Sequence, residues 1–524
     1  MKKAKKRIST ARRSIHSLRK MSVNNGPPAT FVNEMVNLLN AGELELFERK
    51  AKKAIQSWPN HPIGWKALGN LFLMRGRHKN ALEPLSKCLQ IAPDDAQVHN
   101  NLGSAFLELG RFKEADESFR QALELNPDYV QAHTNRGTCL LELGRFEEAI
   151  ESYRQTLALK PDFSLAHNNL GNAYKAKGDF TRAKDCYMRA LALNPNLPQA
   201  SLNLGLVLDQ YFDEKNEAKK YYQKELSLDP NNAEAHQGYG NFLVKYGSTQ
   251  GLKHLEMARQ LKPNLKNLQS QLGTAYLEFG KKNEAISSLK IALKENPDDV
   301  DAKYYMSIAE GRLPDRKTRT AYIKNLFDNY SSNFETHLVE KLEYKVPIIA
   351  REMIEEIFVN DARFQDMADL GCGTGLSGLA FTDCAKNIVG IDLSRKMLDI
   401  ASDKGVYDIL LQGEITEVLD KLDRKFDFFL ATEVTIYFQE LKSLFASIKT
   451  RAVPGALFVF STERCEGDGF AVNEKTGRTA HCADYIRNMA ENFNFQIIKN
   501  KRLPLRKDKD GWAEGELYIM KIQK

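Results

Sequence analysis

The chain has 524 residues, of which 42% are hydrophobic and 27% are charged, and its formal net charge is +7. This length predicts at least two domains, and the composition is typical of a soluble globular protein and excludes a disordered chain. No apolar run approaches the ~20 residues that cross a bilayer, so we expect no transmembrane segment. We expect no secretory signal either, because no apolar segment follows the basic N-terminus.

Positive charge is concentrated in residues 1–25, which carry nine Lys and Arg residues and no acid. The rest of the chain therefore has a net charge of about −2 (7 − 9). Since like charges repel one another and this stretch has little apolar surface to bury, we predict a flexible basic arm. Contact with nucleic acid, contact with an anionic surface and no specific contact remain open, and the composition also suits an organelle transit peptide.

The seven cysteines are scattered along the chain, and none of them forms a C-x-x-C pair. The sequence therefore predicts neither a metal site nor a disulfide framework. A reducing compartment fits this usage, and we expect a cytoplasmic protein.

From about residue 26 to 297 the chain repeats with a period of about 34 residues, marked by prolines and by two sets of glycines. The first glycine of each repeat should permit close helix packing, the second should open the turn between two helices, and the proline should end the second helix. The pattern resembles the tetratricopeptide repeat, which implies an all-α solenoid of about eight repeats over 26–312. The prolines are Pro59, Pro93, Pro127, Pro161, Pro195, Pro230, Pro263 and Pro297.

Four asparagines stand 34 residues apart on the helices expected to line the concave face of this solenoid: Asn101, Asn135, Asn169 and Asn203. A carboxamide both donates and accepts, so it can pair with any peptide unit. The series resembles the asparagine ladder of O-GlcNAc transferase repeats, which implies a protein or peptide partner clamped in the groove. The alternative is that asparagine merely tolerates a solvated helix face. The periodic histidines, such as His99 and His133, lie about 10 Å apart and are expected to be core or groove side chains.

The stretch 367–375 is an apolar run that ends in Asp369 and then in glycines at alternate positions. It predicts a buried parallel strand followed by a tight turn and a helix, with bare backbone and free N–H groups facing a ligand. The alternative is an ordinary turn without a ligand. A second apolar strand ends in Asp392, 23 residues later, where a carboxylate can accept both ribose hydroxyls of an adenosine.

These two motifs resemble those of class I S-adenosylmethionine-dependent methyltransferases. The resemblance implies an α/β Rossmann-like domain over 313–524 with S-adenosyl-L-methionine as cofactor. Gly413 and Glu414 fall where the family has an acid near the adenine amine, and Thr432 and Glu433, at the end of a fourth strand, should face the sulfonium and the acceptor. The expected cofactor-binding residues are Asp369, Gly371, Cys372, Gly373, Thr374, Gly375, Asp392, Leu393, Gly413, Glu414 and Thr432.

Two further segments resemble a bacterial group of repeat-containing predicted methyltransferases. The segment around Tyr330 implies a lid over 320–350, with a plain amphipathic helix as the alternative. In the segment 477–482, His481 can be a general base and Arg478 can hold a carboxylate or phosphate, although a loop histidine can equally serve as a structural hydrogen-bond donor. Together with Glu433, these are the candidate catalytic residues.

The sequence thus predicts a methyltransferase whose solenoid recruits a protein or peptide substrate. Two alternatives remain open. In one, a small molecule, lipid or glycan is methylated and the repeats serve assembly; in the other, the chain is a non-catalytic scaffold that binds the cofactor.

Overall fold

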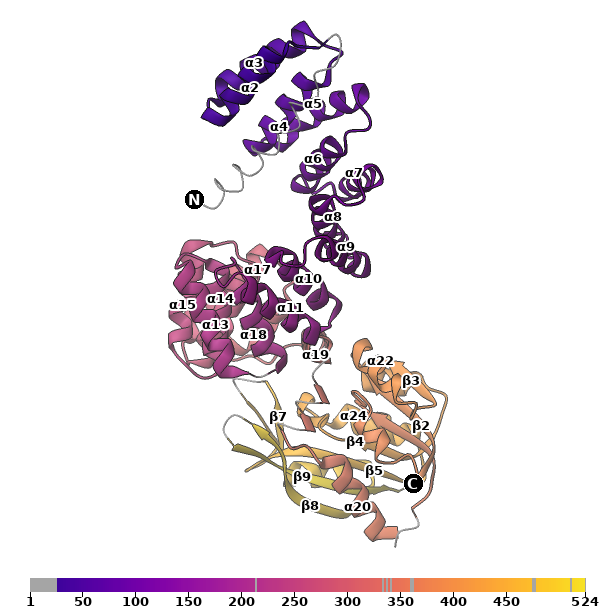
Figure 1. The fold of residues 1–524 in the computed structure, drawn as a ribbon. Helices are drawn as coiled ribbons and strands as arrows, with labels where there is room; N and C mark the ends of the chain where they lie inside the picture. Colours follow the sequence, from indigo (N-terminus) through magenta and orange to yellow (C-terminus); the bar gives the residue numbers. More distant parts are fainter. Residues whose placement is uncertain are drawn as a thin grey trace. The chain divides into compact units, whose positions relative to one another are not determined.

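The structure is a computed structural model that describes residues 26–212, 214–331, 334–335, 338–339, 342–358, 362–473, 477–508 and 511–523. The predicted basic arm, 1–25, lies outside these residues. The chain divides into two compact units, one through Ala235 and one from His236 onward. Figure 1 colours the chain along its sequence and labels its helices and strands. The division falls inside the helical repeats, so we keep residue 313 as the proposed boundary between the repeats and the α/β fold.

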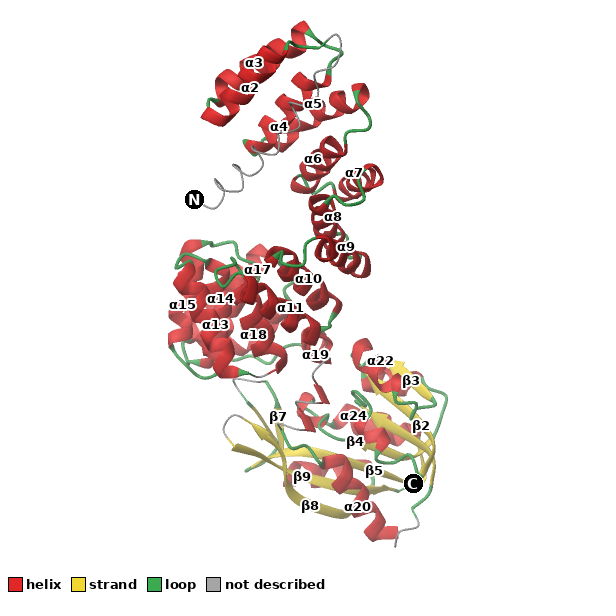
Figure 2. Ribbon diagram, in the orientation of Figure 1, coloured by secondary structure: helices red, strands yellow, loops and turns green. Residues whose placement is uncertain are grey.

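The first unit consists of helices that form successive hairpins. Its helices are α2 (Ala29–Ala41), α3 (Leu44–Ser57), α4 (Pro62–Met74), α5 (His78–Ile91), α6 (Ala96–Glu108), α7 (Phe112–Leu125), α8 (Val130–Glu142), α9 (Phe146–Leu159), α10 (Ser164–Lys177), α11 (Phe180–Leu193), α12 (Ala200–Val207) and α13 (Lys215–Leu228). Figure 2 draws the labelled elements of this unit as helices, in red. The predicted all-α repeat architecture is confirmed.

The two sets of glycines have different structural roles. A Cβ on Gly137 would lie 2.7 Å from the ring of Tyr153, so this glycine allows the two helices of one hairpin to approach closely. Gly144 has φ +72°, a left-handed conformation that closes helix α8 and that other residues rarely adopt. Both roles follow from the repeat pattern, and they recur along the solenoid.

Two repeats depart from the period, because the step from Pro195 to Pro230 is 35 residues and the step from Pro230 to Pro263 is 33; the first of them contains an insertion. The structure accommodates the extra residue in a π-helical turn, Leu208–Phe212, which continues α12. The second glycine is replaced in this repeat by Phe212, so the left-handed helix end is absent there. A wider helical turn is a known way to absorb a one-residue insertion.

The second unit begins within α14, continues through further repeat helices and ends in an α/β domain. The repeat helices are α14 (Ala233–Lys245), α15 (Gln250–Leu261), α16 (Leu268–Glu278), α17 (Lys282–Glu295) and α18 (Val300–Ala309). The α/β domain contains α19 (Arg316–Tyr330), α20 (Val346–Phe358), α21 (Leu376–Leu379), α22 (Arg395–Asp403), α23 (Ile415–Lys421), α24 (Lys442–Arg451) and α25 (Ala483–Phe493).

The strands of the α/β domain form one sheet in the order β3-β2-β1-β4-β5-β7-β6, and β9 pairs antiparallel with β5 and β8. From β3 to β5 neighbouring strands run parallel. The strands are β1 (Phe364–Leu370), β2 (Ala385–Asp392), β3 (Ile409–Gln412), β4 (Phe426–Ala431), β5 (Ala452–Cys465), β6 (Phe470–Val472), β7 (Thr479–Cys482), β8 (Phe495–Asp508) and β9 (Gly511–Ile522). This confirms the predicted Rossmann-like domain.

Alternate strand residues point to two separate hydrophobic cores. Phe429 of β4 packs with residues of α23, α24 and α25, whereas its neighbour Phe428 packs with residues of α20. Since both sheet faces are covered by helices, the carboxyl ends of the parallel strands are the edge left for a ligand.

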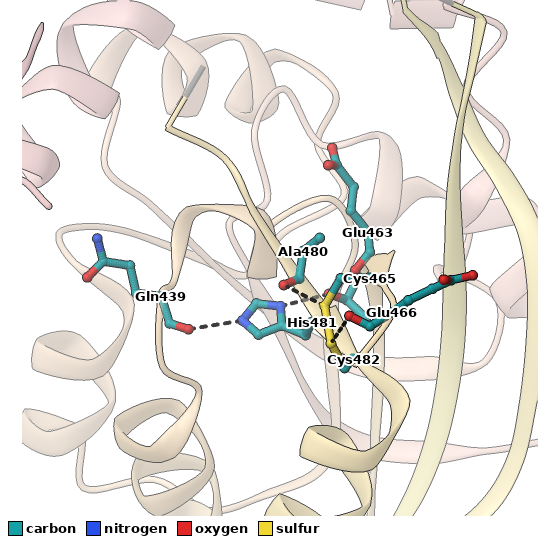
Figure 3. Close-up of a disulfide and its surroundings, with 8 residues drawn as sticks. Gln439, Glu463, Cys465, Glu466, Ala480, His481 and Cys482 are labelled. Atoms are coloured by element: carbon teal, nitrogen blue, oxygen red, sulfur yellow. Dashed lines mark hydrogen bonds between the residues drawn. A yellow bond between two sulfur atoms is a disulfide. The ribbon is translucent and has the colours of Figure 1, made fainter. Parts of the chain in front are cut away.

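Cys465 and Cys482 form a disulfide, although the sequence predicted no disulfide framework (Figure 3). The two residues are register partners on the parallel strands β5 and β7, with Cα atoms 4.7 Å apart. The two cysteines are 17 residues apart in sequence, and no sequence pattern predicted the pair because only the strand pairing brings them together.

Among the helices of the described ranges, we find none whose length and apolar character would carry it through a lipid bilayer.

Candidate functional site

The glycine turn after β1 has the predicted form. Gly371 and Gly373 have φ values of +73° and +53°, in the region that favours glycine. A Cβ on Gly371 would lie 2.4 Å from Cγ2 of Val434, so the absence of a side chain also allows close packing. The N–H groups of Gly371 and Cys372 donate to the carbonyl of Ile391, at 2.7 and 3.0 Å, which ties the turn to the end of β2.

Asp369 lies beneath this turn and is 1% exposed. Its Oδ2 accepts a hydrogen bond from the Tyr407 hydroxyl at 2.7 Å, while Oδ1 has no hydrogen-bond partner among the described residues. Burial raises the pKa of this carboxyl to about 7, and the nearby charge of Asp392 acts in the same direction. Asp369 is therefore a buried residue that supports the turn, and it does not line the cavity on the other side of the turn.

This carboxyl should make stability depend on pH. A raised pKa means that the folded state holds the proton more tightly than the unfolded state, so stability falls as pH rises from about 4 to about 7, by at most about 1.4 kcal/mol per pH unit. Asp369→Asn removes the titration, so we expect urea unfolding of the variant to show a shallower loss over this window. An unchanged pH profile would contradict the assignment.

Asp392 lies at the end of β2 with its carboxylate facing the turn. Its Oδ2 accepts from the N–H of Gly373 at 2.9 Å, and its Oδ1 accepts from the N–H of Ser394 at 2.8 Å. These two bonds fix the orientation of the carboxylate. Since a carboxylate offers about four lone-pair positions, it retains acceptor capacity for a ligand.

A cavity of about 580 Å³ opens above the turn, within the range typical of cofactor and substrate sites. Most of the predicted residues line it. These are Tyr330, Gly371, Cys372, Gly373, Thr374, Asp392, Leu393, Glu414, Thr432, Glu433 and Arg478. Four predicted residues are absent from the lining: Asp369, Gly375, Gly413 and His481.

Glu414 lines the cavity but already has partners in the chain. It is the N-cap of α23, and its Oε2 accepts from the N–H of Glu417 at 3.0 Å and from Arg316 at 2.7 Å. Thr432 contacts a residue that the sequence analysis missed, Ser377, with the two hydroxyl oxygens 2.7 Å apart. At these points the cavity wall is therefore held by hydrogen bonds between residues far apart in the chain, Arg316 to Glu414 and Ser377 to Thr432.

Glu433, two residues after β4, has φ +58° and a buried carboxylate oxygen. Its Oε2 pairs with Arg506, which also pairs with Glu463, and its Oε1 has no partner among the described residues. Burial raises the pKa of Glu433, and the charge of Arg506 opposes this shift. A left-handed glutamate with an unpaired buried oxygen is a costly arrangement, and such arrangements cluster at functional sites.

His481 lies on β7, is 1% exposed and has both ring nitrogens in hydrogen bonds (Figure 3). Nε2 is 3.2 Å from the carbonyl of Gln439 and therefore donates, which leaves Nδ1 to accept from the Thr462 hydroxyl at 2.8 Å. Burial lowers the pKa of His481 to about 4, so the ring is neutral near pH 7. The lone pair that a base would use is occupied, so the geometry matches the structural alternative.

The segment α19 supplies one wall of the cavity, including Tyr330, whose ring lies edge-on to Phe334 at 6.0 Å. Asp328 on the same helix accepts from the Ser394 hydroxyl at 2.6 Å, which ties α19 to the residues after β2. Parts of the predicted lid, 320–350, lie outside the described residues.

The sequence did not predict Arg506, Ser377 and Tyr407 as residues of the site, because no local motif marks them.

The predicted ladder asparagines are all half-buried, and three of them donate to an asparagine of the preceding repeat. Asn101 donates to Asn70 at 2.8 Å, and Asn135 donates to Asn100 at 3.1 Å. Asn203 donates to Asn168 at 3.1 Å, and Asn169 accepts from Asn168 at 3.4 Å. Each carboxamide has two donor hydrogens and two lone pairs, so these bonds leave capacity for a peptide.

The periodic histidines repeat one local hydrogen bond. Nε2 of His99, His133 and His167 lies 2.8 to 2.9 Å from the carbonyl of the proline six residues earlier. Trp65 donates its indole N–H to the Pro59 carbonyl in the same way. These side chains therefore close the turn between repeats.

Comparison with known proteins identifies both parts of the chain. Family models described as "Tetratricopeptide repeat" match residues 64–128, 100–162, 164–197 and 270–310, and one described as "Methyltransferase domain" matches residues 368–460. The ubiquinone biosynthesis O-methyltransferase, mitochondrial, of Saccharomyces cerevisiae is 30% identical over 131 residues. That match covers 23% of this chain and 42% of the yeast enzyme, so the chain spans less than half of that relative's length.

Several solved structures resemble the repeats. A MamA protein is 26% identical with a TM-score of 0.30, covering 32% of this chain and 91% of that chain. A tetratricopeptide repeat protein from Parabacteroides merdae ATCC 43184 is 19% identical with a TM-score of 0.40, covering 48% and 98%. YrrB, described as having an unusual peptide-binding site, is 24% identical with a TM-score of 0.29, covering 36% and 96%.

Proposed function

Because the chain combines tetratricopeptide repeats with a methyltransferase domain, we propose that it is an S-adenosylmethionine-dependent methyltransferase whose repeats recruit a protein or peptide substrate. The cavity above the glycine turn carries the proposal. It joins bare backbone at Gly373 to the carboxylate of Asp392. No other arrangement in the described part of the chain combines these features.

The lining residues fit the cofactor. A ligand can lie against the turn at Gly373, where an added Cβ would come no closer than 3.7 Å to another described residue, and the hydroxyl of Thr374 is buried there without a partner among the described residues. The oriented carboxylate of Asp392 would accept the ribose hydroxyls. Glu414 would lie near the adenine, although its Oε2 is already bonded to Arg316.

The chain's own contribution to the reaction would be positioning and proton removal. When bound, S-adenosylmethionine supplies an electrophilic methyl group. Tyr330 and the aromatic wall of α19 would exclude water, and alignment alone can lower much of such a barrier. Glu433 would accept the acceptor's proton at its unpartnered Oε1, since burial raises its pKa. His481 is not proposed as the base.

A second candidate is a small-molecule acceptor bound in the cavity, with the repeats serving assembly. Two observations favour it. Aromatic side chains such as Phe327 and Phe334 line the cavity, and the yeast relative is an O-methyltransferase of ubiquinone biosynthesis.

Methyl-labelled S-adenosylmethionine, incubated with the purified full chain and cell lysate, separates these functions. Label in protein bands is the expected result. Label confined to small molecules would replace the first candidate with the second. No label anywhere, with S-adenosylhomocysteine binding intact by calorimetry, would leave a non-catalytic scaffold and overturn both.

The asparagine ladder allows a test of recruitment. Replacing Asn135 and Asn169 together with alanine should reduce label transfer to protein severalfold, because two donors to the partner's main chain are lost, while S-adenosylhomocysteine affinity stays unchanged. Ser104→Ala is a matched control, since it removes an oxygen to which Asn135 donates at 3.3 Å but leaves the amides in place. Equal transfer by all three proteins would show that the ladder serves only repeat stacking.

A further inference from the structure

A half-buried arginine on α19, Arg319, lines the cavity, and the nearest negative charges acting on it, Glu414 and Asp315, form no ion pair with it among the described residues. Its Nη1 atom is buried and has no hydrogen-bond partner, and the described residues offer it no carboxylate in ion-pair contact. Burial lowers the pKa of this guanidinium, which reflects the cost of keeping the charge away from water. A guanidinium nitrogen that is buried without a hydrogen-bond partner is costly, and an anion bound at this point would offset that cost.

The neighbouring cations of the cavity differ from Arg319 in this respect. Arg316 pairs with Glu414, Arg506 pairs with two glutamates, and Lys507 pairs with Glu343. Glutamates of the chain thus neutralise these three cations. Arg319 differs from them, and an anionic ligand would supply its ion-pair partner.

A second arginine of the cavity lining, Arg478, is linked to Arg319 through the contacts of Tyr304. The ring of Tyr304 stacks on Tyr322, one turn along α19 from Arg319, with centroids 3.8 Å apart. Its hydroxyl lies against Gly477, where an added Cβ would be 1.7 Å away, and Arg478 is the next residue. The charges of Arg319 and Arg478 both oppose the rise in the pKa of the buried Tyr304 hydroxyl, so both guanidinium groups act at this point.

Arg478 also lines the cavity, next to aromatic side chains. Its charge lowers the pKa of Tyr437, which burial raises, and Tyr437 meets Phe327 edge-on with ring centroids 5.5 Å apart. A ligand at this end would therefore place an apolar body against rings and an oxyanion between two guanidinium groups. Guanidinium is suited to carboxylate and phosphate because its planar fork donates two parallel hydrogen bonds.

We propose that Arg319 and Arg478 form an oxyanion site that holds a carboxylate or phosphate of the methyl acceptor. The proposal rests on the proposed function, since it names the chemical class of substrate at the same cavity. It applies equally to a free amphipathic acid and to an acidic side chain of a peptide, and the test separates these sources.

The test is calorimetry on the full chain saturated with S-adenosylhomocysteine. Benzoate and phenyl phosphate represent a free acceptor, and an acetylated, amidated tripeptide with a central glutamate represents a protein side chain. We expect at least one probe to bind, and Arg319→Gln and Arg478→Gln each to weaken it about tenfold or more, as expected for hydrogen bonds to a charged group. Whichever probe binds identifies the source.

Arg312→Gln is the matched control, because Arg312 is exposed, pairs with Glu310 and lies outside the cavity lining. It should leave probe affinity unchanged. Arg319→Lys keeps the positive charge but loses the two parallel donors of the guanidinium, so it should bind the probes with intermediate affinity. That result would show that the loss of affinity in Arg319→Gln does not come from unfolding. The proposal is overturned if no probe binds, or if probe affinity is the same in all variants. S-adenosylhomocysteine affinity, measured in the same samples, reports separately on the proposed function.

Discussion

Arg506→Met should destabilise the α/β domain by about 3–5 kcal/mol, the cost of removing one partner from a buried ion pair. Arg506 is 4% exposed and pairs with Glu433 and Glu463, so the variant removes the ion-pair partner of two carboxylates. Hydrogen exchange of β5 and β8 peptides in a urea series measures this effect locally, apart from the repeats.

Two variants make the test of Arg506 specific. Arg502→Met changes an exposed arginine of the same strand and should alter stability by less than about 0.5 kcal/mol. Adding Glu433→Gln to Arg506→Met should recover part of the loss, because one unpaired carboxylate is removed. If Arg506→Met proves as stable as the parent chain, the ion pairs do not hold these strand ends together.

Asp392→Asn should weaken S-adenosylhomocysteine binding by about 1.5–3 kcal/mol, the range for hydrogen bonds to charged groups. The amide keeps one acceptor oxygen and nearly the same shape, so one of the backbone N–H groups of Gly373 and Ser394 can still be satisfied. The loss should therefore come mainly from the ribose hydroxyls, and isothermal calorimetry measures it directly.

A structurally matched carboxylate serves as the control for Asp392. Asp427 also accepts two backbone N–H groups, from Gln365 and Asp366 at 2.7 and 2.9 Å, but it lies at the amino end of β4, away from the cavity. Asp427→Asn should leave cofactor affinity unchanged. Equal losses in both variants would indicate that the sheet, and not the cofactor site, had been damaged.

The sequence by itself determined the repeat architecture and the glycine turn. Gly137 and Gly144 act within one hairpin, and Gly371 and Asp392 act at the ends of two adjacent strands, so the residues that carry each signal are close in the chain or recur at a fixed step. Local backbone geometry imposes these residue types, and a pattern can therefore predict them.

Only the tertiary structure decided which polar side chains reach the cavity. His481 has a promising local motif, yet Thr462 and Gln439 occupy its ring nitrogens. Arg506 has no motif, yet it joins Glu433 to Glu463. Such contacts join residues 19 to 73 positions apart, and burial and partner geometry set their chemistry. Strand pairing places these residues next to one another, and their spacing in the sequence does not predict the contact.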